Sequence, residues 1–170
     1  MKKRQILKWV ILVIAIAINL FILINAFITG EASAKESNMV AHTAADVVNT
    51  VKPETITPSN FDRFAFDIRK LVGHFGLFSV SGIFSSWGLY LFVKDSKAGY
   101  FLWQLLITFG FGFVMAVTSE LAQIFVEGRT GAWADVGIDF GGYFLGVLLV
   151  FLIFLFRKSH IFCKNEYVKK

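Results

Sequence analysis

The chain has 170 residues, of which 56% are hydrophobic, and it carries a formal net charge of +5 at pH 7. A soluble domain averages about 45–50% apolar residues, so a chain with this composition, 20 phenylalanines and only two prolines favours lipid-facing helices. Because the basic residues flank apolar runs, the positive charge indicates membrane topology and predicts no nucleic-acid partner.

Four apolar runs are long enough to cross a membrane as helices, since a span needs about 20 mostly apolar residues. In chain order the runs cover about residues 9–28, 71–93, 100–120 and 135–156. Helices are expected because lipid offers backbone N–H and C=O groups no water partner. The sequence therefore predicts an all-α membrane protein, in which residues 1–170 form one bundle of about four transmembrane helices.

The first run follows a basic segment and precedes Ala32-Ser33-Ala34, a stretch similar to a signal peptidase site. A signal sequence has an apolar core of about 7–15 residues, and the run over 9–28 is longer. We therefore expect the first helix to stay uncleaved. Cleavage would leave three spans and the same polar residues.

Lys and Arg residues set the expected orientation, because they favour the cytoplasmic side of a membrane. With both termini in the cytoplasm, most of the basic residues lie on that side, including those of the tail 157–170. Both termini on one side require an even number of crossings, and four crossings satisfy this. The segment 29–70 between the first two spans is then an outer segment.

The outer segment has the pattern of an amphipathic helix followed by a break. Its apolar residues at helical spacing are Val40, Ala44, Val47, Val48 and Val51. Pro53 and Pro58 then interrupt the chain, and Ser59 with Asp62 resembles a helix N-cap with its capping-box partner. We expect a helix that lies on the bilayer surface and then a short helix that leads into the second span.

Ionisable and amide side chains gather in three short stretches that share one membrane depth. The candidate site residues are Lys70, His74, Glu120, Gln123, Arg129, Asp135 and Asp139. Residues three or four apart share a helix face, and the predicted topology puts all three stretches at the outer membrane face. An ionisable group inside a span costs about 2.5–3.5 kcal/mol at the bilayer centre. Several together predict a partner network or a water-filled cavity.

Two further features of these stretches concern packing and metal binding. Gly142 and Gly146 form a small-xxx-small pair that lets another helix approach closely. The residues with metal-ligand chemistry are His74, Glu120, Asp135 and Asp139, but their spacing matches no recognised metal motif. The sequence therefore predicts no metal site and no cofactor.

The same residues, in this order, resemble the VanZ-like family. The pattern is K-x-x-x-H at Lys70 and His74, then E-x-x-Q, then R, then D-x-x-x-N/D-x-x-G beginning at Asp135. The resemblance covers about residues 60–150, and Asp139 stands where the family often has asparagine. It implies a bacterial plasma-membrane protein of the cell envelope with a role in tolerance of teicoplanin-type glycopeptide antibiotics.

Several functions stay open at this point. The first is a binding protein that holds a lipid-linked cell-wall precursor, a lipid headgroup or a lipoglycopeptide at the outer face. The second is a membrane enzyme acting on an extracytoplasmic lipid or wall precursor, with Glu120 or Asp135 as general base and Arg129 with Lys70 holding an anionic group. A third reading is purely structural: an ion-pair network that only fixes helix register, in a small helper for another membrane protein. A transporter ranks last, because the cytoplasmic halves of the spans are almost wholly apolar.

Overall fold

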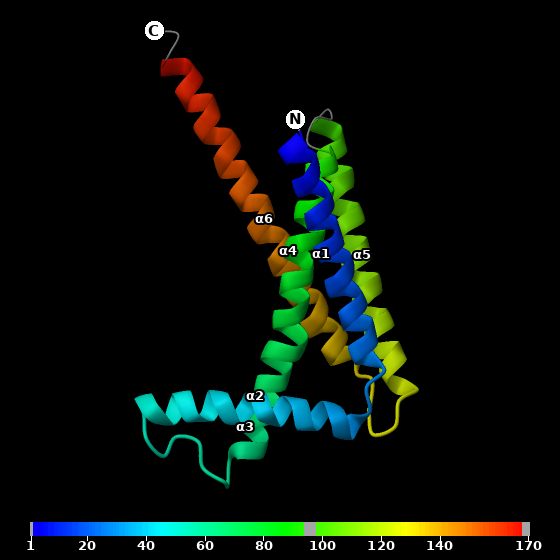
Figure 1. The fold of residues 1–170 in the computed structure, drawn as a ribbon, viewed down its shortest axis with the longest axis vertical. Coiled ribbons are helices and arrows are strands. Elements are labelled where there is room, and N and C mark those ends of the chain that lie inside the picture. Colours follow the sequence, from blue (N-terminus) through cyan, green and yellow to red (C-terminus); the bar gives the residue numbers. More distant parts are fainter. Residues whose placement is uncertain (1, 94–97, 168–170) are drawn as a thin grey trace.

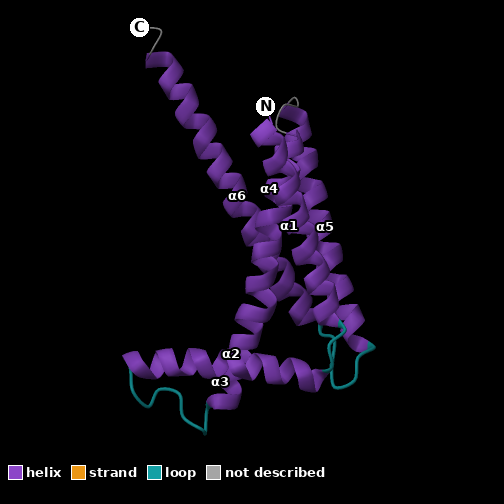
Figure 2. Ribbon diagram, viewed as in Figure 1, coloured by secondary structure: helices purple, strands orange, loops and turns teal. Residues whose placement is uncertain are grey.

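A computed structural model describes residues 2–93 and 98–167 of the chain. These residues form α-helices and one π-helical segment, with no strand among them (Figure 2). In chain order the elements are α1 (Lys2–Ala26), α2 (Gly30–Val51), α3 (Phe61–Ile68), the π-helix η1 (Arg69–Gly76), α4 (Leu77–Val93), α5 (Ala98–Ile124) and α6 (Trp133–Tyr167). The predicted all-α fold is confirmed.

Four helical segments are long and apolar enough to cross a membrane. They are Gln5–Ala26, Phe61–Phe92, Leu102–Ile124 and Trp133–Leu155. The number of spans agrees with the sequence-based prediction, and the chain is a multi-pass membrane protein. The second span differs in where it begins, because α3, η1 and α4 run on without a break. Arg69 and Leu77, which join them, keep helical backbone angles (φ −58°, ψ −45° and φ −63°, ψ −41°).

The helix α2 crosses the end of the bundle instead of running along it (Figure 1). The Thr29 hydroxyl accepts a hydrogen bond from the Ala32 backbone N–H (3.4 Å), which begins the helix. Ala41 and Ala45 are buried against the rest of the protein, whereas Val47 and Val51 are exposed. The expected amphipathic helix is therefore present, and its contact with a bilayer surface stays a prediction.

The predicted N-cap at Ser59 is wrong. Asn60 is the residue that precedes α3, and its side chain forms no cap bond. Its side-chain amide bonds to the preceding turn: Oδ1 accepts a hydrogen bond from the Thr57 backbone N–H (2.8 Å), and Nδ2 donates one to the Thr55 carbonyl (3.0 Å). The Ser59 hydroxyl pairs with the hydroxyl of Thr57 (2.8 Å). Local turn bonds thus use the side chains that would otherwise cap the helix.

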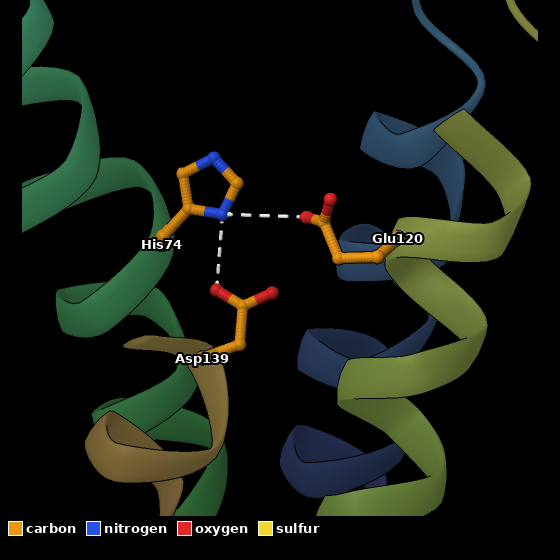
Figure 3. A group of neighbouring side chains, drawn as sticks. All are labelled: His74, Glu120 and Asp139. Atoms are coloured by element: carbon orange, nitrogen blue, oxygen red, sulfur yellow. Dashed lines mark hydrogen bonds and ion pairs between the residues drawn. The ribbon is translucent and has the colours of Figure 1, made fainter. Parts of the chain in front are cut away.

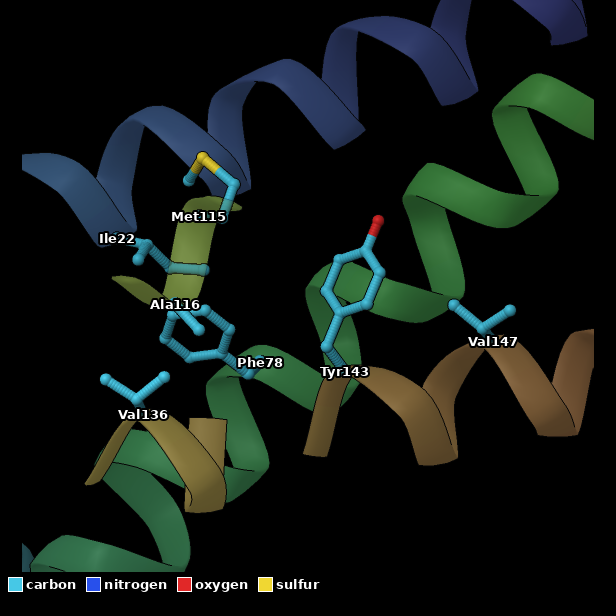
Figure 4. Close-up of a cluster of buried hydrophobic side chains, with 7 residues drawn as sticks. All are labelled: Ile22, Phe78, Met115, Ala116, Val136, Tyr143 and Val147. Carbon is cyan, nitrogen blue, oxygen red and sulfur yellow. The ribbon is translucent and has the colours of Figure 1, made fainter. Parts of the chain in front are cut away.

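The core lies where α1, α4, α5 and α6 meet. Its buried apolar side chains are Ile22, Phe78, Met115, Ala116, Val136, Tyr143 and Val147 (Figure 4). A polar contact inside the bundle adds to this packing: Asn19 of α1 donates to Ser85 Oγ (3.2 Å) and accepts from Ser81 Oγ (2.9 Å), both on α4. These bonds tie α1 into the bundle, and the retention of this helix stays a prediction.

Glycines allow α6 to lie directly on η1 and α4. A Cβ at Gly142 would meet the backbone of Phe75, and a Cβ at Gly146 would meet the backbone of Ser79 and Ile83. Gly82 of α4 leaves the same kind of space for the backbone of α6 at Tyr143. Close approach of these helices brings η1 beside the first turns of α6.

The start of α1 and the end of α6 lie at the same end of the molecule, opposite α2 (Figure 1). This arrangement follows from an even number of crossings. The side of the membrane that each end faces stays a prediction. The helix α6 continues as far as Tyr167, so the predicted tail 157–170 is helical up to that residue. Residues 168–170 lie outside the described residues.

Candidate functional site

The structure brings all seven predicted site residues to the end of the bundle that α2 crosses. The π-helix η1 carries Lys70 and His74, and the last turns of α5 carry Glu120 and Gln123. Arg129 lies in the following loop, and the first turns of α6 carry Asp135 and Asp139. We call His74, Glu120 and Asp139 the central triad. Glu120 and Asp139 are only 3% and 0% exposed.

The central triad converges on one histidine nitrogen (Figure 3). His74 Nδ1 lies 3.0 Å from Asp139 Oδ1, within hydrogen-bond distance, and 3.8 Å from Glu120 Oε1. One ligand atom from each of the three residues lies within 4.8 Å of the others. Since the three side chains come from η1, α5 and α6, only the packed bundle creates this arrangement.

Glu120 is held in place through both of its carboxylate oxygens. Gln123 Nε2 donates to Oε1 (2.9 Å), and the backbone N–H of Ala132 donates to Oε2 (3.1 Å). The glutamine is one helical turn further along the same face of α5, as its spacing indicates. The loop after α5 therefore folds back to fix the direction in which Glu120 points.

Arg129 joins this loop to α1. Its guanidinium donates to the backbone carbonyls of Ile28 (3.1 Å) and Asn25 (3.2 Å), and to Gln123 Oε1 (3.0 Å). Burial lowers the pKa of Arg129, and the positive charge of Arg69 lowers it further. Arg129 therefore orders Gln123 and through it Glu120, while its charge adds to that of Arg69.

The turn that presents Arg129 depends on a glycine with left-handed backbone angles. Gly128 has φ of +72°, a conformation that favours glycine because it carries no Cβ. Its backbone packs directly on Gly30 at the start of α2, where a Cβ would meet the backbone of Gly128. Gly30 also donates its backbone N–H to the carbonyl of Glu127 (2.9 Å). The loop and the start of α2 thus form one unit.

Lys70 and Asp135 form an ion pair beside the central triad. Lys70 Nζ also lies 4.8 Å from the centre of the Phe66 ring, a cation–π contact. Asp135 is in the first turn of α6, where the helix dipole favours a carboxylate. The pair is less buried than the triad, and it joins η1 to the start of α6.

A cavity of about 310 Å³ lies between α1, α2, η1 and the end of α5. Its apolar wall includes Phe21, Ile22, Val40, Leu77 and Phe78, and its polar wall includes Glu36, Arg69, His74, Ser119, Gln123 and Arg129. Ligand pockets usually measure about 300–1,000 Å³. This space therefore has the size and the mixed lining of a small binding site, with His74 in its wall.

A family model described as VanZ/LLP1 matches residues 9–156, which is most of the chain. The chain belongs to the VanZ/LLP1 family. No curated protein and no solved structure matches it. The resemblance drawn from the ordered polar residues is therefore confirmed at the level of the family.

The sequence did not indicate three features of this VanZ/LLP1 site. Lys70 and His74 share a π-helix, a form that is frequent at functional sites and for which the sequence offers no signal. Arg69, which was not among the candidate site residues, lines the cavity. Tyr143 is fully buried, and the absence of a side chain at Gly112 of α5 makes room for its ring. Gly82 of α4 and Gly112 of α5 both face Tyr143, and these two glycines are the sequence signal that could have located it.

The arrangement in this VanZ/LLP1 protein has two chemical capabilities. The cavity combines an apolar wall with two guanidinium groups, which suits an amphiphile with a negatively charged head. The triad places an imidazole between two buried carboxylates, which suits proton transfer or a positive ion. The two regions share His74.

Proposed function

We propose that this protein binds a lipid-linked, negatively charged molecule of the bacterial cell envelope at the outer membrane face, and thereby contributes to tolerance of teicoplanin-type glycopeptides. The observation that carries the proposal is the cavity under α2, which joins an apolar wall from α1 and α4 to Arg69 and Arg129. An acyl chain fits the apolar wall, and a phosphate or carboxylate group fits the two arginine side chains.

The charge of the cavity wall supports an anionic ligand. Neither Arg69 nor Arg129 takes part in an ion pair among the described residues, and the three hydrogen-bond acceptors of Arg129 are uncharged. Glu36 on the α2 wall is the acid among the lining residues. Because arginine binds phosphate and carboxylate through two parallel N–H donors, these side chains suit such a headgroup.

The test combines antibiotic tolerance with analysis of bound lipid. The wild-type chain, Arg129→Gln and Ser37→Phe are expressed at equal levels in a susceptible bacterium, and the minimal inhibitory concentration of teicoplanin is measured. Ser37 lines the cavity from α2, so a phenylalanine there fills the space without removing a charge. The exposed Arg63 on α3 provides the matched control Arg63→Gln.

We expect the wild type and Arg63→Gln to raise tolerance and to retain an anionic lipid through purification, as detected by native mass spectrometry. Arg129→Gln and Ser37→Phe should lose both properties. If Ser37→Phe retained full tolerance and full lipid content at normal expression, the cavity would not be the binding site.

A second candidate, a membrane enzyme acting on the same class of molecule, is favoured by the central triad. His74 lies within hydrogen-bond distance of a buried aspartate, and a histidine oriented by a carboxylate is a common general base. In that case His74→Gln should abolish product formation in lipid profiles while the lipid still copurifies. Loss of binding together with activity would favour the pure binding function.

A further inference from the structure

We propose that His74, Glu120 and Asp139 bind one divalent cation, with Zn²⁺ the best match to their ligand chemistry. This inference concerns the central triad and does not rest on the amphiphile-binding function of the cavity. It departs from the prediction of no metal site, which was drawn from spacing along the chain. The three ligands come from η1, α5 and α6, so no linear motif could have revealed them.

The distances fit a small cation. Zn²⁺ binds histidine nitrogen and carboxylate oxygen at about 2.0–2.2 Å, so two ligands of a tetrahedral ion lie about 3.4 Å apart. His74 Nδ1 lies 3.0 Å from Asp139 Oδ1 and 3.8 Å from Glu120 Oε1. All three ligand atoms lie within 4.8 Å of one another and face a common space (Figure 3). Small side-chain movements would bring them onto one ion.

Asp139 provides a second and independent indication. Its side chain is 0% exposed, and its Oδ2 has no hydrogen-bond donor among the described residues. A buried carboxylate oxygen without a partner costs free energy, because it has lost its hydrogen bonds to water and forms none with the protein. Oδ1 already lies within hydrogen-bond distance of His74, and a cation bound by the carboxylate through both oxygens would supply the partner that Oδ2 lacks.

The charge balance also favours a divalent ion. Glu120 and Asp139 bring two carboxylates into a buried space, and within the described part of the chain no Lys or Arg forms an ion pair with either. Lys70 pairs with Asp135 instead. Protonation of His74 would offset one carboxylate, whereas a divalent ion with neutral histidine offsets both. Uncompensated buried charge strongly destabilises a fold.

The surroundings of Glu120 have the form found around metal ligands. Ligating carboxylates are usually held by further hydrogen bonds, which fix their direction. Gln123 Nε2 and the Ala132 backbone N–H hold the two oxygens of Glu120, and Arg129 in turn holds Gln123. His74 also lines the cavity, which gives an ion a route of entry. Three protein ligands leave a fourth position for water or a ligand.

The test measures metal content and affinity directly. The full chain is purified in detergent with a tag that contains no histidine, stripped with a chelator, reloaded with ZnCl₂ and freed of excess metal. Zinc per chain is then measured by inductively coupled plasma mass spectrometry, and the Kd by calorimetry. The ligand variants are His74→Gln, Glu120→Gln and Asp139→Asn. Their matched controls are His42→Gln and Asp67→Asn, at exposed positions outside the triad.

We expect about one Zn²⁺ per chain in the wild type and both controls, and the level of the buffer blank in the three ligand variants. Gln123→Ala, which removes support from Glu120, should weaken the Kd about 10–100-fold. Equal zinc content in the wild type and Asp139→Asn would overturn the proposal. So would loss of zinc in His42→Gln.

Folding is checked separately for every variant by circular dichroism and elution volume. If the ligand variants do not fold, the stripped wild type decides the question. Zn²⁺ should then raise its Tm and Mg²⁺ at equal concentration should not, because Mg²⁺ prefers octahedral oxygen sites. An unchanged Tm with Zn²⁺ would refute the site. Since no lipid or antibiotic enters these measurements, the outcome is independent of the tolerance test.

Discussion

Replacing Gly142 with alanine tests whether the close contact between α6 and η1 positions the site. A Cβ at this position would meet the carbonyl oxygen, carbonyl carbon and Cα of Phe75, all of which are backbone atoms. No side-chain rotation can relieve that contact, so the two helices must move apart. Phe75 follows His74 in η1, and the movement therefore displaces the triad histidine.

The size of the effect follows from a comparison on the same helix. Gly137 also lies in α6, and a Cβ there would meet nothing within 4 Å. In a helix, alanine is more favourable than glycine by about 0.5–1 kcal/mol, and this gain applies to both positions. Overpacking costs about 1–3 kcal/mol, and it applies only at Gly142. We therefore expect Gly137→Ala to be more stable than Gly142→Ala by about 1–3 kcal/mol.

The assay is reversible unfolding in mixed detergent micelles, followed by far-ultraviolet circular dichroism. The free energy of unfolding should rise slightly in Gly137→Ala and fall in Gly142→Ala, and only the second should lose Zn²⁺ uptake. Equal stabilities of Gly137→Ala and Gly142→Ala would show that α6 and η1 are not in backbone contact, and the site geometry derived from that contact would fail with it.

Three other predictions concern polar contacts. A double-mutant cycle on Lys70→Met and Asp135→Leu should give a coupling energy of about 1 kcal/mol in the same unfolding assay, and additive effects would deny the ion pair. Asn19→Leu should lower the free energy of unfolding by about 0.6–1.7 kcal/mol, from the average to the largest value for hydrogen bonds between membrane helices. Arg129→Lys should lower the Tm while Arg63→Lys does not, because an ammonium group cannot reproduce the planar fork of donors that reaches three separate acceptors.

The number of spans and the depth of the polar residues could be predicted because both depend on distance along a helix. Hydropathy marks where the chain meets lipid, and a fixed rise per residue then puts Lys70, Glu120 and Asp135 at one level. The contacts among them could not be predicted. That His74 faces Asp139 and that Gln123 supports Glu120 depend on how three helices are rotated and spaced.

The residue at which the second membrane-spanning helix begins could not be predicted from hydropathy. The segment Phe61–Phe92 has 32 residues and measures roughly 48 Å at a rise of about 1.5 Å per residue. The hydrocarbon core is only about 30 Å thick, so part of the helix extends beyond it. The charged residues Asp62, Arg63 and Asp67 are exposed there. The hydropathy of the sequence falls where the chain leaves the lipid, although the helix and its backbone hydrogen bonds continue beyond that point.

The distribution of buried charge argues for a function at one membrane face. Among the side chains whose burial the structure describes, the buried acidic or basic ones are Glu120 and Asp139, and both lie at the α2 end. Toward the start of α5 the buried polar groups are neutral, and Thr108 donates its hydroxyl to the carbonyl of Gln104 within the same helix (2.8 Å). An ion or proton pathway through a membrane is usually marked by ionisable residues along its length. The neutral half of the bundle therefore favours binding or chemistry at the α2 end over transport across the membrane.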